Sequence, residues 1–195
     1  RYVFTAQAQD AAENTGKKSA EFIVEVDTKA PNMPLVSAIS TDSGLDTKDG
    51  ITKAQNLIIT GTAEANSTVD VFIEGVMIGM TKTNESGIWS LDYTQTTLEE
   101  GNYQITAIAT DLAGNRGLKS GALDISIDTS APAPPTVDLM VTSDLGLSNT
   151  DNLTSKTTPT LEGTAEPNST LELVINGRFL ATTRTDTAGH WMYRF

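Results

Sequence analysis

A long internal repeat constrains the fold of this chain more than any other feature. The stretch GTAEANSTVDVFIEGVMIGMTKTNESGIWSLDY, beginning at Gly61, aligns without a gap with GTAEPNSTLELVINGRFLATTRTDTAGHWMYRF, beginning at Gly163. A second pair, YVFTAQAQDAAENTG at Tyr2 and YQITAIATDLAGNRG at Tyr103, comes from another part of the same unit. The two offsets, 102 and 101 residues, are too long for a solenoid repeat and match a whole sandwich domain.

A third matched pair sets the domain boundaries. DTKAP at Asp27 corresponds to DTSAP at Asp128, and each reads as a short linker stiffened by proline. We therefore expect residues 1–26 to be the C-terminal part of one repeat and residues 27–127 to be a complete repeat. Residues 128–195 are expected to be the N-terminal part of a further repeat. The chain reads as a window on a longer array, with any targeting signal outside it.

Alternating apolar residues indicate the fold class. Val69, Val71 and Ile73 recur at every second position, and the later copy repeats this with Leu171, Leu173 and Ile175. Hairpin turns are expected at Glu74-Gly75 and Asn176-Gly177, and further strands near 57–63, 78–83, 88–94, 103–109 and 123–127. No apolar pattern of helical period competes with these strands. The sequence predicts an all-β chain of tandem immunoglobulin-like antiparallel β-sandwiches.

The charge balance narrows the range of partners. The formal net charge of −12 argues against nucleic acid and against an anionic membrane surface, and suits a cationic partner such as a divalent metal. No stretch is apolar for long enough to cross a membrane. The chain has no cysteine and one histidine, His190. Disulfides and thiolate zinc sites are excluded, and other transition-metal sites are disfavoured.

Acidic residues gather in loops that the sandwich topology should bring together. The loop DSGLDTKDG, residues 42–50, allows three interpretations: a solvated turn, a metal-binding loop, or a carboxylate pair for acid–base chemistry. Alternate loops of a sandwich lie at opposite poles, so this loop should lie beside the outgoing linker and a second group beside the incoming one. Both groups offer the oxygen ligands that calcium prefers. The candidate ligands are Asp42, Asp46, Asp49 and Asp128 at one pole and Asp27, Glu64, Asp111 and Asn115 at the other.

The later copy carries a weaker version of the acidic loop. DLGLSNTDN keeps Asp144 and Asp151 but has Ser148 in place of Asp46, and Glu166 corresponds to Glu64. We include Asp144, Asp151 and Glu166 as candidate calcium ligands. The plain alternative is that aspartate, asparagine, serine and glycine close turns by bonding their own backbone. The leading segment has Glu13 where Gly114 stands, so its turn is expected to differ.

Other prominent residues have structural interpretations. Trp89 and Trp191 occupy the same place in a strand after a glycine turn, which favours core anchors over sugar-stacking platforms. Tyr103 begins the penultimate strand and suits a tyrosine corner. His190 is expected at the surface or a sheet edge, because no base and nucleophile constellation recurs around it. The paired carboxylates lie on turns without other cleft residues, so we do not expect an enzyme.

Several motifs in combination resemble a known family. GTAEANSTVDVFIEG, SGIWSLD, YQITAIATDLAGN and DTSAP are similar to the bacterial Ig-like repeats of giant surface adhesins, and the resemblance covers nearly the whole chain. Such repeats occur in biofilm-associated proteins and in the large non-fimbrial adhesin of Salmonella. The resemblance implies type I secretion to the bacterial cell surface, long tandem arrays, virulence or biofilm roles, and calcium bound near domain junctions.

Together these observations predict a calcium-rigidified stalk of a secreted bacterial adhesin. Its partners would be neighbouring repeats of the same chain and, through a distal region, a host-cell or surface receptor. Two alternatives remain open. One is an Ig-like module that binds a glycan or a protein through its loops. The other is an accessory module of a secreted polysaccharide-degrading enzyme.

Overall fold

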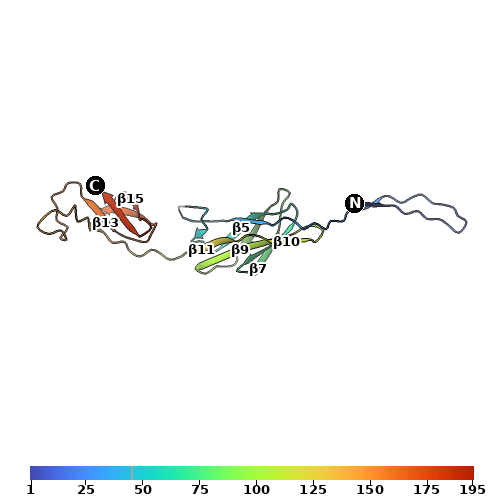
Figure 1. Ribbon diagram of the computed structural model, residues 1–195, viewed down its shortest axis with the longest axis horizontal. Coiled ribbons are helices and arrows are strands. Elements are labelled where there is room, and N and C mark those ends of the chain that lie inside the picture. The colour runs from blue at the N-terminus through green and yellow to red at the C-terminus, as the bar shows by residue number, and fades with distance from the viewer. Residues whose placement is uncertain (45) are drawn as a thin grey trace. The chain divides into compact units, whose positions relative to one another are not determined.

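The computed structural model describes residues 1–44 and 46–195, and within them every regular element is a β-strand (Figure 1). No helix in this described part is long and apolar enough to cross a membrane. The chain divides into two compact units, Arg1–Thr129 and Ser130–Phe195. The first unit contains a leading hairpin, residues 1–26, and a middle domain, residues 27–129.

The middle domain is a sandwich of two sheets (Figure 1). One sheet has the order β3-β5-β8 and the other β4-β11-β9-β6-β7, with β10 pairing to β9. All pairs are antiparallel except β4 with β11. The immunoglobulin-like sandwich predicted from the sequence is therefore confirmed. The strands are β3 (Leu35–Ile39), β4 (Ile51–Thr52), β5 (Leu57–Thr62), β6 (Thr68–Ile73), β7 (Val76–Lys82), β8 (Ile88–Tyr93), β9 (Gly101–Thr110), β10 (Arg116–Lys119) and β11 (Leu123–Ile127).

The core of the middle domain follows the alternation of its strands. Val69 and Val71 on β6 are fully buried, and they pack in one cluster with Ile105 on β9 and Ile59 on β5. Side chains at every second position of a strand point to the same face, so each strand supplies one apolar row to the space between the sheets. This burial is the main favourable contribution to the stability of the domain.

A buried tryptophan packs against a glycine, and there is no space for a larger residue at the glycine position. Trp89 is 1% exposed and lies against Gly61 on the neighbouring strand, where a Cβ atom would overlap the indole ring and the carbonyl oxygen of Leu35. In the later unit Trp191 is 3% exposed and a Cβ at Gly163 would meet the same kind of obstruction. Both tryptophans are core anchors, as the sequence predicted.

Turns and corners match the sequence expectations. Glu74 and Gly75 both have positive φ angles, 49° and 77°, as a tight two-residue hairpin turn requires. Asn176 and Gly177 repeat this with 51° and 76°. The hydroxyl of Tyr103 donates a hydrogen bond of 2.9 Å to the carbonyl oxygen of Glu99, which forms the expected tyrosine corner.

The chain enters and leaves the middle domain at opposite ends. At one end, the Asn115 side chain in the turn after β9 donates a hydrogen bond of 3.2 Å to the carbonyl oxygen of Asp27. At the other end, the Asp128 amide bonds the carbonyl oxygen of Thr52 at 2.9 Å, directly after β11. The ten-residue strand β9 runs between these ends, a length of about 30 Å. The domain is therefore inserted in line with the chain.

The leading hairpin consists of β1 (Tyr2–Phe4) and β2 (Phe22–Val24). Its residues correspond to β9 and β11 of the middle domain. The Ala6 amide donates a hydrogen bond of 3.0 Å to the Ser19 hydroxyl, as the Ala107 amide does to the Ser120 hydroxyl at 2.9 Å. The hairpin thus keeps the local geometry of a sandwich edge.

The second unit repeats the first half of the middle domain. Its strands form one three-stranded sheet, β12-β13-β16, and one hairpin, β14-β15. Their registers reproduce those of β5 with β8 and of β6 with β7, including the same irregularity after Leu173. The strands are β12 (Asp138–Leu139), β13 (Thr160–Thr164), β14 (Thr170–Ile175), β15 (Arg178–Arg184) and β16 (His190–Arg194).

Candidate functional site

The acidic loop of residues 42–50 lies beside the outgoing linker of the middle domain. Gly50 accepts a hydrogen bond of 2.9 Å from the Ser126 amide, and β4, which follows the loop, pairs in parallel with β11. Gly50 has a φ of 76°, and a Cβ atom there would lie 2.7 Å from the Asp124 carbonyl oxygen. The close approach of loop and strand end places the loop at the pole where Asp128 leaves the domain.

Most carboxylates of this loop close turns. Asp46 accepts a hydrogen bond from the Lys48 amide, and Asp49 accepts one from the Ile51 amide, both at 3.0 Å. Each is a side chain bonding the backbone two residues on. Both side chains are exposed. This turn geometry accounts for two of the three aspartates without a metal.

Asp42 differs from the other two aspartates. Its Oδ2 accepts a hydrogen bond of 3.1 Å from the Gly50 amide across the loop. Its Oδ1 is buried and has no hydrogen-bond partner among the residues that the structure describes. A buried carboxylate oxygen without a donor costs free energy, so this oxygen stands out among the described residues of the loop as an acceptor whose position calls for a further partner.

The second unit reproduces this arrangement. Asp144 is 3% exposed, its Oδ2 accepts a hydrogen bond of 3.3 Å from the Asn152 amide, and its Oδ1 is again buried and unpaired within the described residues. Asp151 bonds the Leu153 amide at 3.1 Å, as Asp49 bonds Ile51. The recurrence in two copies shows that the orphaned oxygen is a property of the loop sequence.

Ser148 takes over the turn role of Asp46. Its hydroxyl accepts a hydrogen bond of 3.2 Å from the Thr150 amide, in the same register as the bond from Lys48 to Asp46. The exchange of aspartate for serine therefore preserves the turn while removing one negative charge. The loop needs a short polar acceptor at this position, and a carboxylate is not required for its shape.

At the opposite pole the structure brings three of the four candidates together. Asp111 accepts hydrogen bonds from the Ala113 and Asn115 amides, at 2.9 and 2.8 Å, and from the Asn115 side chain at 2.8 Å. The Asn115 side chain also bonds the Asp27 carbonyl oxygen, while the Asp27 carboxylate bonds the Lys29 amide at 2.9 Å. The bond from the Asn115 side chain is the main cause that lowers the pKa of Asp111.

Glu64 and Glu166 take part in their turns through their backbone carbonyl oxygens. The Glu64 carbonyl oxygen accepts bonds from the Ser67 hydroxyl at 2.6 Å and the Thr83 hydroxyl at 2.7 Å. The Glu166 carbonyl oxygen accepts the hydroxyl of Thr185 at 2.7 Å. Both glutamate side chains are exposed. Serine and threonine hydroxyls thus hold this turn through the backbone at the glutamate positions, which does not require a glutamate side chain.

The donor set fits calcium in part. Within residues 1–44 and 46–195 no group of three or more Asp, Glu, His or Cys side chains is gathered closely enough to hold a metal ion. Each acidic loop instead supplies one inward carboxylate with a free oxygen. Calcium accepts backbone carbonyls and water besides carboxylates, so a site here would combine Asp42 or Asp144 with such oxygens.

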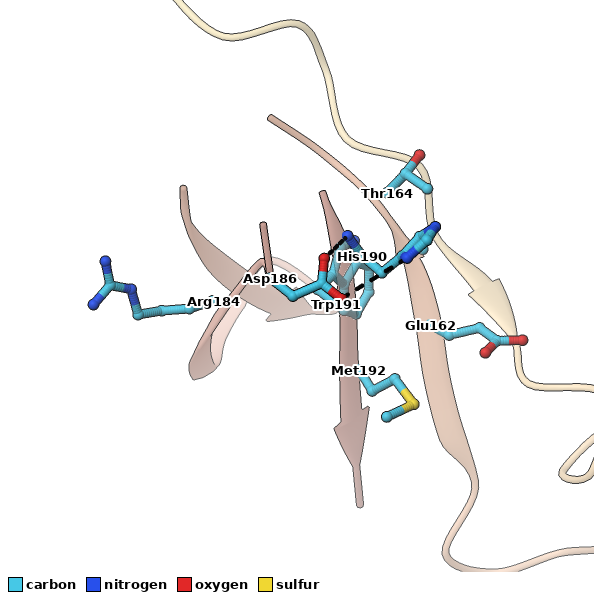
Figure 2. A pocket seen from close by; sticks show the side chains of 8 residues that line it. Glu162, Thr164, Arg184, Asp186, His190, Trp191 and Met192 are labelled. Carbon is cyan, nitrogen blue, oxygen red and sulfur yellow. Dashed lines mark hydrogen bonds and ion pairs between the residues drawn. The ribbon is translucent and has the colours of Figure 1, made fainter. Parts of the chain in front are cut away.

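A hollow on the second unit, shown in Figure 2, was not predicted from the sequence. It has a volume of about 520 Å³ and is lined in part by Glu162, Arg184, Asp186 and His190. Nδ1 of His190 lies 3.9 Å from Oδ2 of Asp186, and the imidazole is mostly exposed, as the sequence predicted. Backbone hydrogen bonds, first that from the His190 amide, lower the pKa of Asp186.

This hollow lacks the parts of a hydrolytic site. The hydroxyl of Thr164 is engaged with that of Thr136 at 2.9 Å, and Figure 2 shows it turned away from the imidazole. The positions that correspond to Asp186 and His190 in the middle domain are Asn84 and Ile88. The carboxylate–imidazole pair is therefore present in the second unit and not at the equivalent positions of the middle domain, and the one hydroxyl among the described lining residues, that of Thr164, is not aligned with it.

Comparison with known proteins identifies the family. The bacterial Ig-like domain family matches residues 30–129 and 131–195, and the chain belongs to this family. One similar solved structure is described as bearing on host cell surface retention of a 1.5-MDa bacterial ice-binding adhesin, with 21% identity and a TM-score of 0.36. Another is a tetra-tandem repeat in the extending region of a large adhesion protein, also with 21% identity and a TM-score of 0.36.

The aligned region covers 97% of this chain in both cases, but 61% and 46% of those two chains. Among curated proteins, none matches the chain with significant similarity.

Proposed function

We propose that this chain is a spacer segment in the stalk of a secreted bacterial adhesin, and that calcium stiffens its junctions. The observation that carries the proposal is the in-line insertion of the middle domain, which the chain enters beside Asn115 and leaves beside Thr52. Domains joined in this way add their length to an array. The stalk would be exported by a type I route and hold a distal receptor-binding region away from the cell surface.

The linkers support a mechanical role. DTKAPNMP and DTSAPAPP are short and rich in proline, which fixes φ and favours extended backbone. The two copies share their turn and core residues and differ mainly in their surface residues. This pattern suits a spacer, which needs a stable fold of fixed length and no particular surface. The proposed role requires no catalytic step.

Calcium would act at the acidic loops. An unpaired Oδ1 on Asp42, beside the outgoing linker, offers the ion one ligand, and further ligands would come from carbonyl oxygens, water and the linker itself. Extracellular calcium modules bind with dissociation constants of about 10⁻⁴ to 10⁻³ M. Because only the folded loop presents this geometry, calcium would stabilise the native state by mass action and favour folding after export.

Thermal unfolding of the 195-residue chain, in chelator and across a calcium titration, tests the calcium part. We expect the unfolding temperature to rise with calcium, and the rise to shrink in Asp42→Asn and Asp144→Asn. Asparagine can still accept the Gly50 amide, so the turn should survive. Asp92→Asn is the matched control, since the exposed Asp92 carboxylate has turn partners of its own, the Thr94 amide at 2.9 Å and the Thr94 hydroxyl at 2.6 Å. A wild-type midpoint indifferent to calcium would refute this part.

Junction stiffness tests the stalk part directly. The chain has no cysteine, so Gln95→Cys and Asn149→Cys can carry spin labels on the two sides of the outgoing linker. We expect a distance distribution that narrows when calcium is added to the labelled chain. A distribution that stays broad with calcium bound would leave a flexible string of domains and contradict a rigid spacer.

Ligand binding through loops is the second candidate. The hollow of Figure 2, with an arginine, a histidine and two carboxylates, is the observation that favours it. A glycan or peptide that binds the wild-type chain, and binds less to His190→Ala or Arg184→Ala, would support this function. An accessory module of a polysaccharide-degrading enzyme would also bind glycan, and would adjoin a catalytic domain in the same protein.

A further inference from the structure

The larger sheet of the middle domain, whose strands β7, β9, β10 and β11 are labelled in Figure 1, has an outer face on which charges are sorted by sign. Val69 and Val71 of β6 are fully buried, so the residues between them, and their register partners on β7 and β9, point outward. Arg116 Nη1 on β10 lies 2.7 Å from Asp70 Oδ2 on β6, so β10 contributes to the same face. This face lies within residues 68–126, inside the complete domain.

The end of this face nearest the incoming linker is basic. Lys82 on β7 and Arg116 on β10 lie in one row across the strands. Lys119 lies one row further along, opposite Ile108. All three cationic side chains are exposed. They are three of the six lysine and arginine residues at positions 27–129, so half of the cations of this domain lie at one end of one face.

The opposite end of the same face is acidic and hollow. The Glu74 carboxylate accepts a hydrogen bond of 2.6 Å from the Gln104 amide, and the Gln104 side chain donates one of 2.9 Å to the Asp124 carboxylate. A hollow of about 460 Å³ lies here, and Asp49 is a third carboxylate in its lining. By its charge, this end of the face suits a cationic side chain.

Between the two charged ends the face is largely apolar. Met77 on β7 lies opposite Phe72 on β6. In the next row, Asp70 lies between Met80 and Ile108, and its charge is offset by its ion pair. Met77 is 47% exposed and Met80 is 61% exposed, and methionine side chains adapt readily to an apolar partner. Along the strands, the face is thus basic, then apolar, then acidic.

We propose that two copies of this chain pair through this face, with the strands of the two sheets antiparallel. A two-fold axis between the faces, running across the strands, places the basic end of each copy over the acidic end of the other. Lys82 of one copy then faces Glu74 of the other. Arg116 likewise faces Asp124. The apolar rows meet between these contacts, and stacked sheets about 10 Å apart let such side chains interdigitate.

The charge balance favours a second copy as the occupant. The chain as a whole has a net charge of −12, and like charges that face each other oppose association. This face is balanced, with three cations and three carboxylates: Lys82, Arg116 and Lys119 with Asp70, Glu74 and Asp124. A wholly basic or wholly acidic partner would leave one end unmatched, whereas a second copy in the reversed orientation matches both ends at once.

The second unit shows which variant removes a charge without disturbing the turn. Asn176 stands where Glu74 stands, and their φ angles are 51° and 49°. The turn therefore keeps its shape without a carboxylate. Arg184 stands where Lys82 stands, so the second unit keeps a cation but lacks the carboxylate that would face it. The pairing is accordingly assigned to the middle domain.

Sedimentation equilibrium of the 195-residue chain tests the pairing, and is done in chelator so that the result is independent of calcium. We expect the mass to rise with concentration and to level off at two copies, because a two-fold contact is closed. Glu74→Asn should weaken the dimer, and Glu74→Lys should weaken it by about tenfold or more, since like charges then face each other. A mass that stays at one copy would leave the face to a different partner and overturn the proposal, as would growth beyond two copies.

A charge swap tests the register. Lys82→Glu should weaken the dimer as Glu74→Lys does, and the double variant Glu74→Lys, Lys82→Glu should restore it, because each new lysine then faces a new glutamate. Glu64→Lys is the matched control, since its exposed side chain lies outside this face, and it should not weaken the dimer. A double variant as weak as either single variant would contradict the proposed register.

The apolar centre is tested by truncation. Met80→Ser should weaken the dimer, because it removes an exposed apolar side chain from the middle of the face. Ile88→Ser is the matched control, since Ile88 is 53% exposed on the other sheet. Thermal unfolding in dilute solution establishes that both variants are folded. Equal dissociation constants for the two variants would show that the contact lies elsewhere and would refute the pairing.

Discussion

The middle domain and the second unit share strand registers and turn residues, yet the same positions are buried to different extents. Val69 and Val71 are fully buried, while Leu171 retains 7% exposure and Ile175 retains 44%. The hairpin β6-β7 and its counterpart β14-β15 have the same pairing, including the same irregularity. In the middle domain β9 and β11 pack on the first hairpin, and the described residues of the second unit contain no counterpart of these two strands. The hairpin is thus formed by local sequence, whereas its burial requires strands far along the chain.

The acidic loops, in contrast to the hairpins, have the same geometry and the same burial in both units. Asp42 and Asp144 make the same bond across the loop, and each keeps an unpaired oxygen. Thr52 and Thr154 both donate a hydrogen bond back to the start of the loop, at 2.6 and 2.5 Å. These contacts form whether or not β11 is present. The geometry of the loop is therefore determined by its local sequence.

Truncation of a core side chain should give the largest difference in stability between equivalent positions of the middle domain and the leading hairpin. Ile105→Ala deletes a fully buried side chain of the middle domain and should lower its free energy of unfolding by about 2 to 5 kcal/mol. Phe4→Ala changes the corresponding residue of the leading hairpin, which is 54% exposed, and should cost far less in dilute solution. Denaturant unfolding followed by Trp89 fluorescence measures both. Equal losses would show that the hairpin is buried in solution.

Adding one methyl group should affect both repeats alike. Gly61→Ala and Gly163→Ala each push a Cβ atom into a backbone carbonyl and a tryptophan ring. Overpacking of this kind costs about 1 to 3 kcal/mol, with values near the upper end because a carbonyl moves less than a side chain. Gly121→Ala is the control, since its position has open space and an ordinary backbone. A second unit insensitive to Gly163→Ala would mean that its sheet is not packed on Trp191.

The sequence predicted the sandwich well because its signals are periodic and appear twice. The alternation in β6, the turn at Glu74-Gly75 and the ends of β11 are where the pattern placed them. One expectation was wrong. Glu13 adopts a φ of 71° where Gly114 has 91°, and the Asp10 turn keeps the hydrogen bonds of the Asp111 turn. Side-chain bonding to the backbone outweighs the strain of a left-handed glutamate.

The candidate site was harder to predict than the fold. Sequence alone treats Asp42, Asp46 and Asp49 as equivalent carboxylates, but the structure assigns two of them to turns and leaves one oxygen of the third unpaired. The burial of this oxygen comes from the fold of the loop itself, because the Oδ1 atom of Asp144 is buried and unpaired in the same way within the described residues. The serine at position 148 was a usable signal, because a position that tolerates aspartate or serine is a turn position.

Loss of the tyrosine corner should have a smaller effect on stability, and this effect should distinguish β9 from β1, its counterpart in the leading hairpin. Tyr103→Phe removes the bond to the Glu99 carbonyl oxygen and should lower the free energy of unfolding by about 1 kcal/mol. Tyr2 holds the equivalent place in the leading hairpin and is 59% exposed. Tyr2→Phe should leave the unfolding midpoint of the middle domain unchanged. A loss in Tyr2→Phe as large as in Tyr103→Phe would contradict this difference.

The smallest effect concerns the two turns that share the D-x-A-x-N pattern. Hydrogen bonds from Asn115 and Asn14 lower the pKa of Asp111 and of Asp10. A lowered folded-state pKa stabilises the fold above the ordinary carboxyl pKa of 3.8, and this contribution is lost as the pH falls through the folded value. The lower midpoint of Asp111→Ala should therefore converge on the wild-type midpoint in acid. Carboxyl titration by NMR measures both groups.

The pKa of Asp10 compares the two turns more directly than unfolding measurements can. Asp10 lies in a hairpin without a covering sheet, so its loss should not change the unfolding midpoint of the middle domain. Its pKa should nevertheless be lowered like that of Asp111, because the bonds that lower it come from its own turn. An ordinary pKa for Asp10 beside a lowered one for Asp111 would show that the turn needs the sandwich around it. Lowered values for both would establish that these loops fold from local sequence, as the recurring Asp42 and Asp144 loops indicate.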